Sequence, residues 1–470
     1  MSPARRETPK AESPALRRLS TGDPNLDSIL GGGFPANSIN ILMGEPGSGK
    51  TILAERLMFA NANGDGRPCV FLTTLAEPLD KVVRYLQQFS FFDETKLAES
   101  IVYDSIGEDL AQGGIAALTP RLKEIITTQG PKIIVIDSFK AIHDLSTSLP
   151  EMRKMLYEVA GLLTAYETTA FLVGEYSTDQ IGKYPEFAVA DGMLELSRTT
   201  RGIRDERFLR VLKLRGSSYL EGVHAFTIAR EGLKVFPRLT SPDTPPTYDI
   251  LAERIPTGIE GLDELFGKGV LRGRSTFVLG PTGSGKTTVA LQFVLEGVRR
   301  GEECMYVSFE ENPSQLEAQI RSLGEDPDEA QKNGLRFLYV SPVELQVDSI
   351  VTTIFRAVRE GDVRRLAVDA IGDLVEATND LQRLHSFLYA LTQHFAVSGV
   401  TSMFPYESTP RGDIMALTRL SALADNILLL GLDLEEGRGR RTIRVVKARG
   451  IKHDLDQHQL RITSKGAEIK

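Results

Sequence analysis

Short apolar runs alternate with amphipathic segments along the whole chain. Several apolar runs have the length of a buried strand, including residues 39–43, 133–136, 277–279 and 366–368. Other apolar residues recur at helical spacing, as in the i, i+3, i+4, i+7 series of Leu291, Val294, Leu295 and Val298. Strands that alternate with helices predict an α/β fold in which helices flank a mostly parallel sheet.

The order of these features repeats once along the chain. Residues 18–51 read RLSTGDPNLDSILGGGFPANSINILMGEPGSGKT, and residues 254–287 read RIPTGIEGLDELFGKGVLRGRSTFVLGPTGSGKT. Near the end of each half, VLKLRG at 211–216 corresponds to VVKARG at 445–450. The interval between matching features is nearly constant and exceeds the roughly 20–50 residues of a solenoid repeat. The sequence therefore predicts two copies of one whole domain.

A stretch rich in Pro, Ser and Thr separates the two copies. It reads PRLTSPDTPPTY over residues 237–248, a composition typical of a linker. Two domains also suit a chain of 470 residues, since one domain usually takes about 100–200. We expect a disordered tail at 1–17, a first domain at 18–236, a linker at 237–253 and a second domain at 254–470.

Each copy carries a G-x-x-x-x-G-K-[ST] loop between an apolar run and a helical pattern. Its glycines let the backbone wrap around phosphates, with N–H groups pointing inward, and the next helix adds its positive end. Lys50 and Lys286 are expected to reach the β- and γ-phosphates of ATP, as catalytic and binding residues. The other candidate nucleotide-binding residues are Gly44, Gly47, Ser48, Gly49 and Thr51, and Gly280, Thr282, Gly283, Ser284, Gly285, Thr287 and Thr288.

Candidate Mg²⁺ ligands accompany each loop. The hydroxyls of Thr51 and Thr287 belong to the loop motif. Asp137 closes KIIVID and Asp369 closes RRLAVD, where an acid at a strand end can hold the metal through water. A strand-end Asp can also cap the following helix.

The second half contains two acids that the first half lacks. Glu310 and Glu311 follow the run CMYVSF, where a carboxylate can activate or position the nucleophile that attacks the γ-phosphate. In the aligned first half, CVFLTTLAEP, Leu75 and Ala76 stand opposite them, and Glu77 is displaced by one residue. The first half either has no such acid or uses Glu77.

Two cations recur near the end of each half. Lys213 and Arg215 lie two apart, so on a strand both would project to one face, with Leu212 and Leu214 on the opposite, buried face. Lys447 and Arg449 repeat the pair. Such cations suit a contact to the γ-phosphate bound by a neighbouring subunit, although a solvated strand face would look the same.

Composition and charge narrow the class of protein. The net charge is −8 and no long basic run is present, which argues against a chain that binds nucleic acid through its phosphates. No apolar stretch is long enough to span a bilayer, and the N-terminus has no apolar signal region. We therefore expect a cytoplasmic protein without membrane contact. Cys69 and Cys304 occupy matching places before apolar runs and are expected to be buried thiols.

With these motifs in place, the chain resembles the KaiC family of circadian-clock ATPases within the RecA superfamily. The resemblance extends from about Leu19 to Lys470 and is carried by the tandem loops, FEE, KLRG followed by FTIAREGLKVFP, and the ending KARGIKHD…ITSKGAEIK. It implies two RecA-like domains that assemble into a double-ring homohexamer, with ATP and Mg²⁺ at the subunit interfaces. In the family, the first ring hydrolyses ATP slowly, and the second ring phosphorylates its own subunits and can take the phosphate back.

The resemblance also assigns roles to individual residues. Glu310 matches the general base for autophosphorylation and is a further candidate metal ligand, with Glu311 beside it. The two Lys-x-Arg pairs match residues that reach the neighbour's nucleotide. The family has adjacent Ser and Thr acceptors; here Ser421 matches the serine, whereas Ala422 replaces the threonine. A single-site autokinase at Ser421 therefore fits better than a two-site cycle, although Ser421 can also be an ordinary helix serine.

Partners and competing functions remain open on these residues. The chain stops soon after KGAEIK, without the extension that receives KaiA in the clock family, which argues against a KaiA-like partner. A KaiB-like partner on the first ring fits the resemblance, but no residue here tests it. Two alternatives to an ATPase and autokinase are a ring in which ATP acts mainly as a scaffold and a RecA-type DNA-dependent ATPase. The acidic charge and the tandem arrangement count against the DNA-dependent enzyme.

Overall fold

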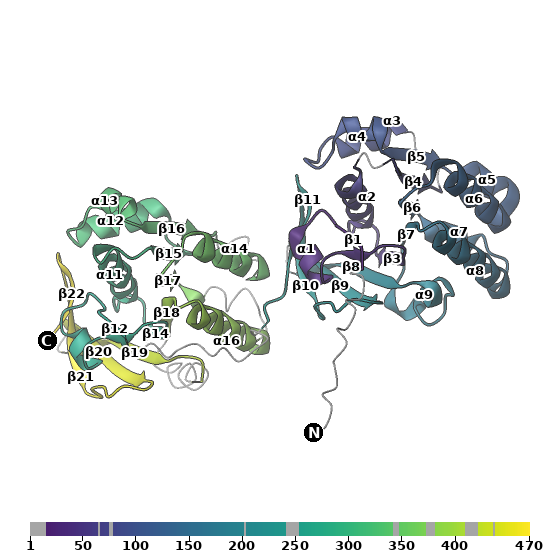
Figure 1. Cartoon of the computed structure of the whole chain (residues 1–470). Helices are drawn as coiled ribbons and strands as arrows, with labels where there is room; N and C mark the ends of the chain where they lie inside the picture. The colour runs from purple at the N-terminus through teal and green to yellow at the C-terminus, as the bar shows by residue number, and fades with distance from the viewer. Residues whose placement is uncertain are drawn as a thin grey trace, which may run out of the picture. The chain divides into compact units, whose positions relative to one another are not determined.

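The computed structural model describes residues 16–63, 66–74, 79–201, 204–240, 253–341, 347–372, 381–408, 422–435 and 438–470. The chain divides between Arg238 and Leu239 into two compact units (Figure 1). Each unit is built on one nine-stranded sheet and also has a separate pair of two-residue strands.

The first sheet has a parallel body and an antiparallel edge. Its parallel strands are, in spatial order, β5 (Ile101–Ser105), β4 (Cys69–Thr73), β6 (Ile133–Asp137), β7 (Thr169–Gly174), β3 (Ile39–Gly44) and β8 (Gly192–Arg201). The antiparallel edge follows as β9 (Arg204–Leu214), β10 (His224–Ala229) and β11 (Gly232–Phe236). The short pair is β1 (Arg18–Leu19) and β2 (Phe34–Pro35).

The helices of the first unit fall between these strands. They are α1 (Pro24–Ile29), α2 (Lys50–Asn61), α3 (Leu79–Leu86), α4 (Glu94–Glu99), α5 (Gly107–Gly113), α6 (Leu118–Gln129), α7 (Phe139–Asp144), α8 (Leu149–Ala165) and α9 (Glu186–Val189). Two short 3₁₀ turns cover Gly114–Ala117 and Thr178–Gln180.

The second sheet repeats this order strand for strand. Its parallel body is β16 (Leu335–Tyr339), β15 (Cys304–Ser308), β17 (Arg365–Asp369), β18 (Thr401–Glu407), β14 (Ser275–Gly280) and β19 (Asn426–Glu435). Its antiparallel edge is β20 (Arg438–Ala448), β21 (Gln457–Thr463) and β22 (Gly466–Ile469), and the short pair is β12 (Arg254–Ile255) and β13 (Val270–Leu271). The described helices are α10 (Leu262–Leu265), α11 (Lys286–Arg299), α12 (Pro313–Ser322), α13 (Pro327–Lys332), α14 (Val347–Glu360) and α16 (Leu381–Val397). The predicted fold class, two tandem α/β domains with mostly parallel sheets, is confirmed.

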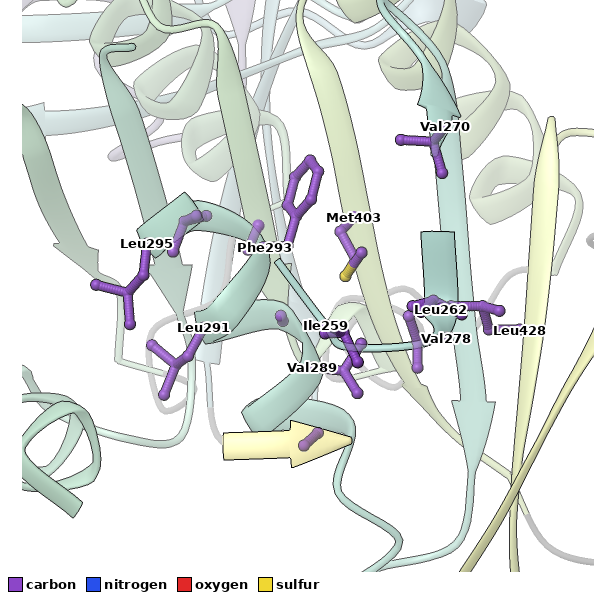
Figure 2. Packing of buried hydrophobic residues seen from close by; sticks show 14 of the residues in the cluster. Ile259, Leu262, Val270, Val278, Val289, Leu291, Phe293, Leu295, Met403 and Leu428 are labelled. Atoms are coloured by element: carbon purple, nitrogen blue, oxygen red, sulfur yellow. The ribbon is translucent and has the colours of Figure 1, made fainter. Parts of the chain in front are cut away.

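Apolar side chains cover both faces of each sheet. The central strands β3 and β14 are buried at every residue, which explains why their sequences read as continuous apolar runs instead of alternating ones. In the second unit, α11 packs on one face: Val289 and Phe293 belong to the same buried cluster as Val278 of β14 (Figure 2). A separate cluster, with residues from α14 and α16, covers the opposite face. Helices on both faces produce a three-layer unit.

The two cysteines occupy equivalent places at the start of β4 and β15. Neither cysteine forms a disulfide and both are fully buried, which confirms the prediction for Cys69 and Cys304. Burial raises the pKa of the Cys304 thiol to about 12, so it stays protonated and unreactive at neutral pH.

Candidate nucleotide-binding sites

The first phosphate loop connects β3 to α2. Gly49 precedes the helix with a φ of 101°, and Lys50 is the first helical residue. The Lys50 ammonium is largely buried and donates to the carbonyl oxygens of Gly44 (3.0 Å) and Glu45 (2.8 Å). Burial lowers the pKa of Lys50, and the nearby carboxylates of Glu175 and Asp137 partly oppose this shift. The ammonium is therefore held at the loop, where it can meet the phosphates of a nucleotide.

A hydroxyl and a carboxylate meet beside this lysine. Thr51 Oγ1 donates to Asp137 Oδ2 at 2.7 Å, although the two residues are far apart in sequence. This pair provides the oxygen ligands that Mg²⁺ prefers, so the residues present fit the metal that the loop motif implies. The same two side chains line a cavity of about 230 Å³, together with Lys50 and Glu175.

The second loop has the same construction. Lys286 Nζ donates to the carbonyl oxygens of Gly280 (2.9 Å) and Pro281 (3.0 Å), and Thr287 Oγ1 donates to Asp369 Oδ2 at 2.9 Å. Burial lowers the pKa of Lys286, and the carboxylates of Glu407, Asp369 and Glu310 partly offset this shift. The structure therefore brings together the loop lysine, the loop threonine and the strand-end aspartate in both units.

Tyr306 distinguishes the second site from the first. Its hydroxyl is fully buried and donates to Asp369 Oδ2 at 2.6 Å. Burial raises the pKa of Asp369, and the hydrogen bonds from Tyr306 and Thr287 oppose the rise. In the first unit the register places Phe71 at the equivalent position, with no hydroxyl to donate to Asp137. The sequence analysis missed Tyr306, which reads as an ordinary core residue of a strand.

Glu310 and Glu311 lie directly after β15, close to the loop lysine and the aspartate. Glu310 is exposed and contributes to the electrostatic environment of Lys286. Glu311 is half-buried and accepts a hydrogen bond from Gln319 of α12 at 2.6 Å. Burial raises the pKa of Glu311, and the hydrogen bond from Gln319 opposes the rise. The two acids thus have different surroundings: Glu311 is anchored to a helix, and Glu310 faces solvent at the site.

The part of the chain that the structure describes does not include the first-unit residues at the corresponding place, Leu75, Ala76 and Glu77. It also does not include the candidate phosphate acceptor, Ser421.

The Lys-x-Arg pairs are similarly held in the two units. Lys213 Nζ donates to the carbonyl oxygen of Ala190 (2.5 Å), and Lys447 Nζ donates to that of Ala424 (2.7 Å). Arg215 and Arg449 follow the strand ends with exposed guanidinium groups, and form ion pairs with Asp191 (3.3 Å) and Asp425 (3.6 Å) respectively.

The predicted alternation of side chains along this strand is wrong in one respect. Leu212 and Leu214 do not share a face: Leu214 belongs to the cluster that includes Val211, whereas Leu212 packs against the cluster on the other face of the sheet. The cause is a β-bulge, because the pairing with β8 shifts between Met193 and Leu194. An equivalent shift occurs in the second unit between Ile427 and Leu428.

One further pair of acids escaped the sequence analysis. Glu175 follows β7 and Glu407 ends β18, each on the strand that pairs with the strand before the phosphate loop. Each carboxylate raises the pKa of the loop lysine of its own unit. Thr282 Oγ1 donates to Glu407 Oε1 at 2.6 Å. The signal was available in the repeat, since both halves place a glutamate at this aligned position.

Among the described residues, no helix combines the length and the apolar character needed to cross a bilayer.

Comparison with known proteins gives a family and full-length relatives. The family described as "ATPase: KaiC" matches twice, over residues 19–240 and 255–470. The circadian clock oscillator protein KaiC of Picosynechococcus sp. is 27% identical over 97% of this chain and 90% of its own length. The clock oscillator protein KaiC 1 of Synechocystis sp. is 25% identical, over 99% and 91%. KaiC of Thermostichus vulcanus is 25% identical, over 100% and 92%.

Proposed function

The chain belongs to the KaiC family of ATPases, and on this premise we propose that it binds Mg·ATP at both phosphate loops and uses the second site as a serine autokinase. The observation that carries this proposal is the composition of the second site. There the loop lysine Lys286 and the Thr287–Asp369 pair lie together with Glu310, which supplies a carboxylate for the nucleophile.

Some residues of the second site would bind Mg·ATP, and Glu310 would transfer a proton. Lys286 would meet the β- and γ-phosphates, and Thr287 with Asp369 would hold Mg²⁺, which supplies charge neutralisation when bound. Glu310 would accept the proton of the attacking hydroxyl, because a general base must be exposed to the nucleophile's side of the site. Glu311, which accepts the hydrogen bond from Gln319, would hold the segment around Glu310 in place.

The acceptor that we propose is Ser421. Ser421 lies shortly before β19 in sequence, and β19 runs parallel to β14, so β19 begins at the edge of the sheet opposite to the phosphate loop of its own domain. Ser421 would therefore meet ATP that is bound by a neighbouring subunit. Its hydroxyl would attack the γ-phosphate and form a phosphoserine, while ADP leaves. Ala422 follows it, so a second acceptor at the neighbouring position is missing and the modification should stop at one phosphate.

We further propose a homohexamer in which the Lys-x-Arg pairs reach across subunit boundaries. Support comes from their similar placement in the two units and from the exposure of the guanidinium groups, 62% for Arg215 and 53% for Arg449. An exposed arginine beside the end of the sheet can serve a neighbour's nucleotide, as arginine fingers do.

The biological role that we propose is clock-like or signalling regulation. The full-length relatives are circadian clock oscillator proteins, and a protein that binds KaiB-like partners would couple its ATP state to them.

Mass spectrometry of the intact chain and its peptides tests this function. After incubation with Mg·ATP, the wild type should gain one phosphate on Ser421, and Ser421→Ala and Glu310→Gln should both lose it. Steady ADP release with no phosphate on any residue would reject the autokinase and leave a KaiC-family ATPase that signals through conformation.

A further inference from the structure

We propose that Glu175 accepts the proton of the water that attacks ATP in the first domain. This inference rests on the proposed function, since it requires that the first phosphate loop binds ATP. It gives the first domain a catalytic carboxylate from a different strand than the one that carries Glu310 and Glu311.

The sheet places Glu175 beside the phosphate loop. β7 pairs directly with β3, and Met43 lies opposite Gly174, so Glu175 stands next to Gly44 where the loop begins. The side chain is exposed and lines the same cavity as Lys50 and Asp137. Burial lowers the pKa of Lys50, and Glu175 is the largest of the influences that raise it again, which agrees with a carboxylate close to the ammonium.

Among the described residues, the other acid that lines this cavity already has a hydrogen-bond partner. The described lining of the cavity contains two carboxylates, Asp137 and Glu175. Asp137 accepts the hydrogen bond from Thr51 and suits the metal. Leu75 and Ala76 occupy the positions that align with Glu310 and Glu311. Glu175 is therefore the carboxylate of the lining that is left for the nucleophile.

The equivalent acid in the second domain has a different task. Glu407 accepts a hydrogen bond from Thr282 of its own phosphate loop at 2.6 Å. The first loop has Pro46 at this place, and proline has no hydroxyl to donate. The second domain thus uses the acid at this position to hold the loop, whereas the first domain leaves it available to a water molecule.

The reaction that follows is hydrolysis of ATP to ADP and phosphate. The water oxygen bonds to the γ-phosphorus as the bond from that phosphorus to the oxygen bridging the β-phosphate breaks, and the electron pair leaves with ADP. The water proton passes to the Glu175 carboxylate and then to solvent. Lys50 neutralises charge that develops on the phosphates.

The test uses the full-length chain with Lys286→Ala, which silences the second site. ADP release at saturating ATP and affinity for a fluorescent ATP analogue are measured for Glu175→Gln and Glu77→Gln. The matched control is Asp179→Asn, which neutralises an exposed acid (68% exposed) shortly after β7. We expect Glu175→Gln to lower kcat at least tenfold with an affinity within about twofold, and Glu175→Asp to restore part of the loss. Glu77→Gln and Asp179→Asn should keep the parental rate.

Three outcomes would overturn the proposal. A normal kcat in Glu175→Gln together with a loss in Glu77→Gln would make Glu77 the proton acceptor. An equal loss of affinity and turnover in Glu175→Gln would reduce Glu175 to a residue that shapes the loop. If the Lys286→Ala parent binds one ATP per chain but releases no ADP, the first domain is not a hydrolase, although ATP binding, and with it that part of the proposed function, survives. A parent that binds no ATP would instead contradict the proposed function itself.

Discussion

At the residue scale, the two sites differ most in what surrounds the strand-end aspartate. Asp369 is nearly completely buried and receives hydrogen bonds from Tyr306 and Thr287, whereas Asp137 receives the threonine hydroxyl beside Phe71. A buried carboxylate without donors favours its protonated form, so the phenol helps Asp369 stay ionised. The phenol would therefore help to keep the proposed Mg²⁺ ligand of the second site ionised.

Replacement of Tyr306 by Phe tests this difference. Loss of the phenol should raise the pKa of Asp369 further and weaken Mg²⁺ binding, because removal of an outer partner of a metal ligand typically costs about 10–100-fold in affinity. We expect the Mg²⁺ concentration for half-maximal ATP turnover to rise at least tenfold. Tyr339→Phe removes an exposed phenol and serves as the control. An unchanged Mg²⁺ requirement in Tyr306→Phe would refute the role of the phenol.

A buried histidine gives the first domain a pH dependence. Arg238 N donates to His224 Nδ1 at 3.0 Å, so His224 Nε2 carries the proton that it shares with the carbonyl oxygen of Leu220. The ring is therefore neutral, and burial lowers its pKa below the ordinary 6.5. Below that value the unfolded chain binds a proton that the folded chain rejects, so the free energy of unfolding falls as the pH falls.

Denaturant unfolding between pH 7.5 and pH 5.5 measures this effect. The wild type should lose stability in the first domain over this window, and His224→Gln should be less stable at pH 7.5 but show a flatter dependence on pH. If both chains lose stability with the same slope, His224 is not the group responsible.

The sequence predicted the residues whose chemistry is local and missed those whose chemistry depends on the fold. Lys50 and Thr51 belong to one continuous motif, and Asp137 was a candidate partner because it closes an apolar strand-like run; the structure places its carboxylate against the Thr51 hydroxyl. Tyr306 and Glu175 gain their meaning only from neighbours on other strands. No period or motif within their own segment indicates those neighbours.

At the element scale, the phosphate loop depends on the strand that flanks it. Gly44 ends β3 with a φ of 146°, and a Cβ at this position would lie 1.9 Å from the carbonyl oxygen of Leu196 in β8. The backbone of β8 therefore fits against the base of the loop only because residue 44 has no side chain. The motif requires glycine here for phosphate binding, and the packing of the sheet requires it as well.

Gly44→Ala should consequently destabilise the first domain by about 2–4 kcal/mol, in the range of substitutions that strain the backbone and overpack a core. The control is Gly161→Ala in α8, where a Cβ meets nothing within 4 Å and alanine favours the helix. Chemical denaturation should show a lower midpoint for Gly44→Ala and an equal or higher midpoint for Gly161→Ala. Equal midpoints for both would contradict the close approach of β8.

Sequence patterns predicted the buried strands of the sheets but not the β-bulge. Continuous apolar runs predicted β3, β6, β14 and β17 because strands buried on both faces lose their alternation. The β-bulge between Met193 and Leu194 was not predictable from β9 alone, since a bulge is a property of the pairing of two strands.

At the scale of the whole molecule, duplication has produced two copies of one topology with unequal chemistry. The strand order is the same in both sheets. The second copy keeps the Glu310–Glu311 pair, and the first has Leu75 and Ala76 in its place. The proposed roles fit this division: a slow first domain whose nucleotide would support assembly, and a faster second domain that would perform phosphoryl transfer.

Single lysine replacements separate these roles. Lys50→Ala should impair assembly with ATP more than it impairs total hydrolysis, while Lys286→Ala should remove most hydrolysis and leave assembly and the slower turnover of the first domain. Size-exclusion chromatography with light scattering, run beside an ADP-release assay, reports both properties. Normal ATP-dependent assembly of Lys50→Ala would contradict the supporting role of the first domain.

The central claim is that both phosphate loops bind ATP, and the stoichiometry of nucleotide binding tests it most directly. Isothermal titration with Mg²⁺ and a slowly hydrolysed ATP analogue should give two nucleotides per chain for the wild type, one each for Lys50→Ala and Lys286→Ala, and none for the double variant. One nucleotide per wild-type chain, or two in either single variant, would contradict the account.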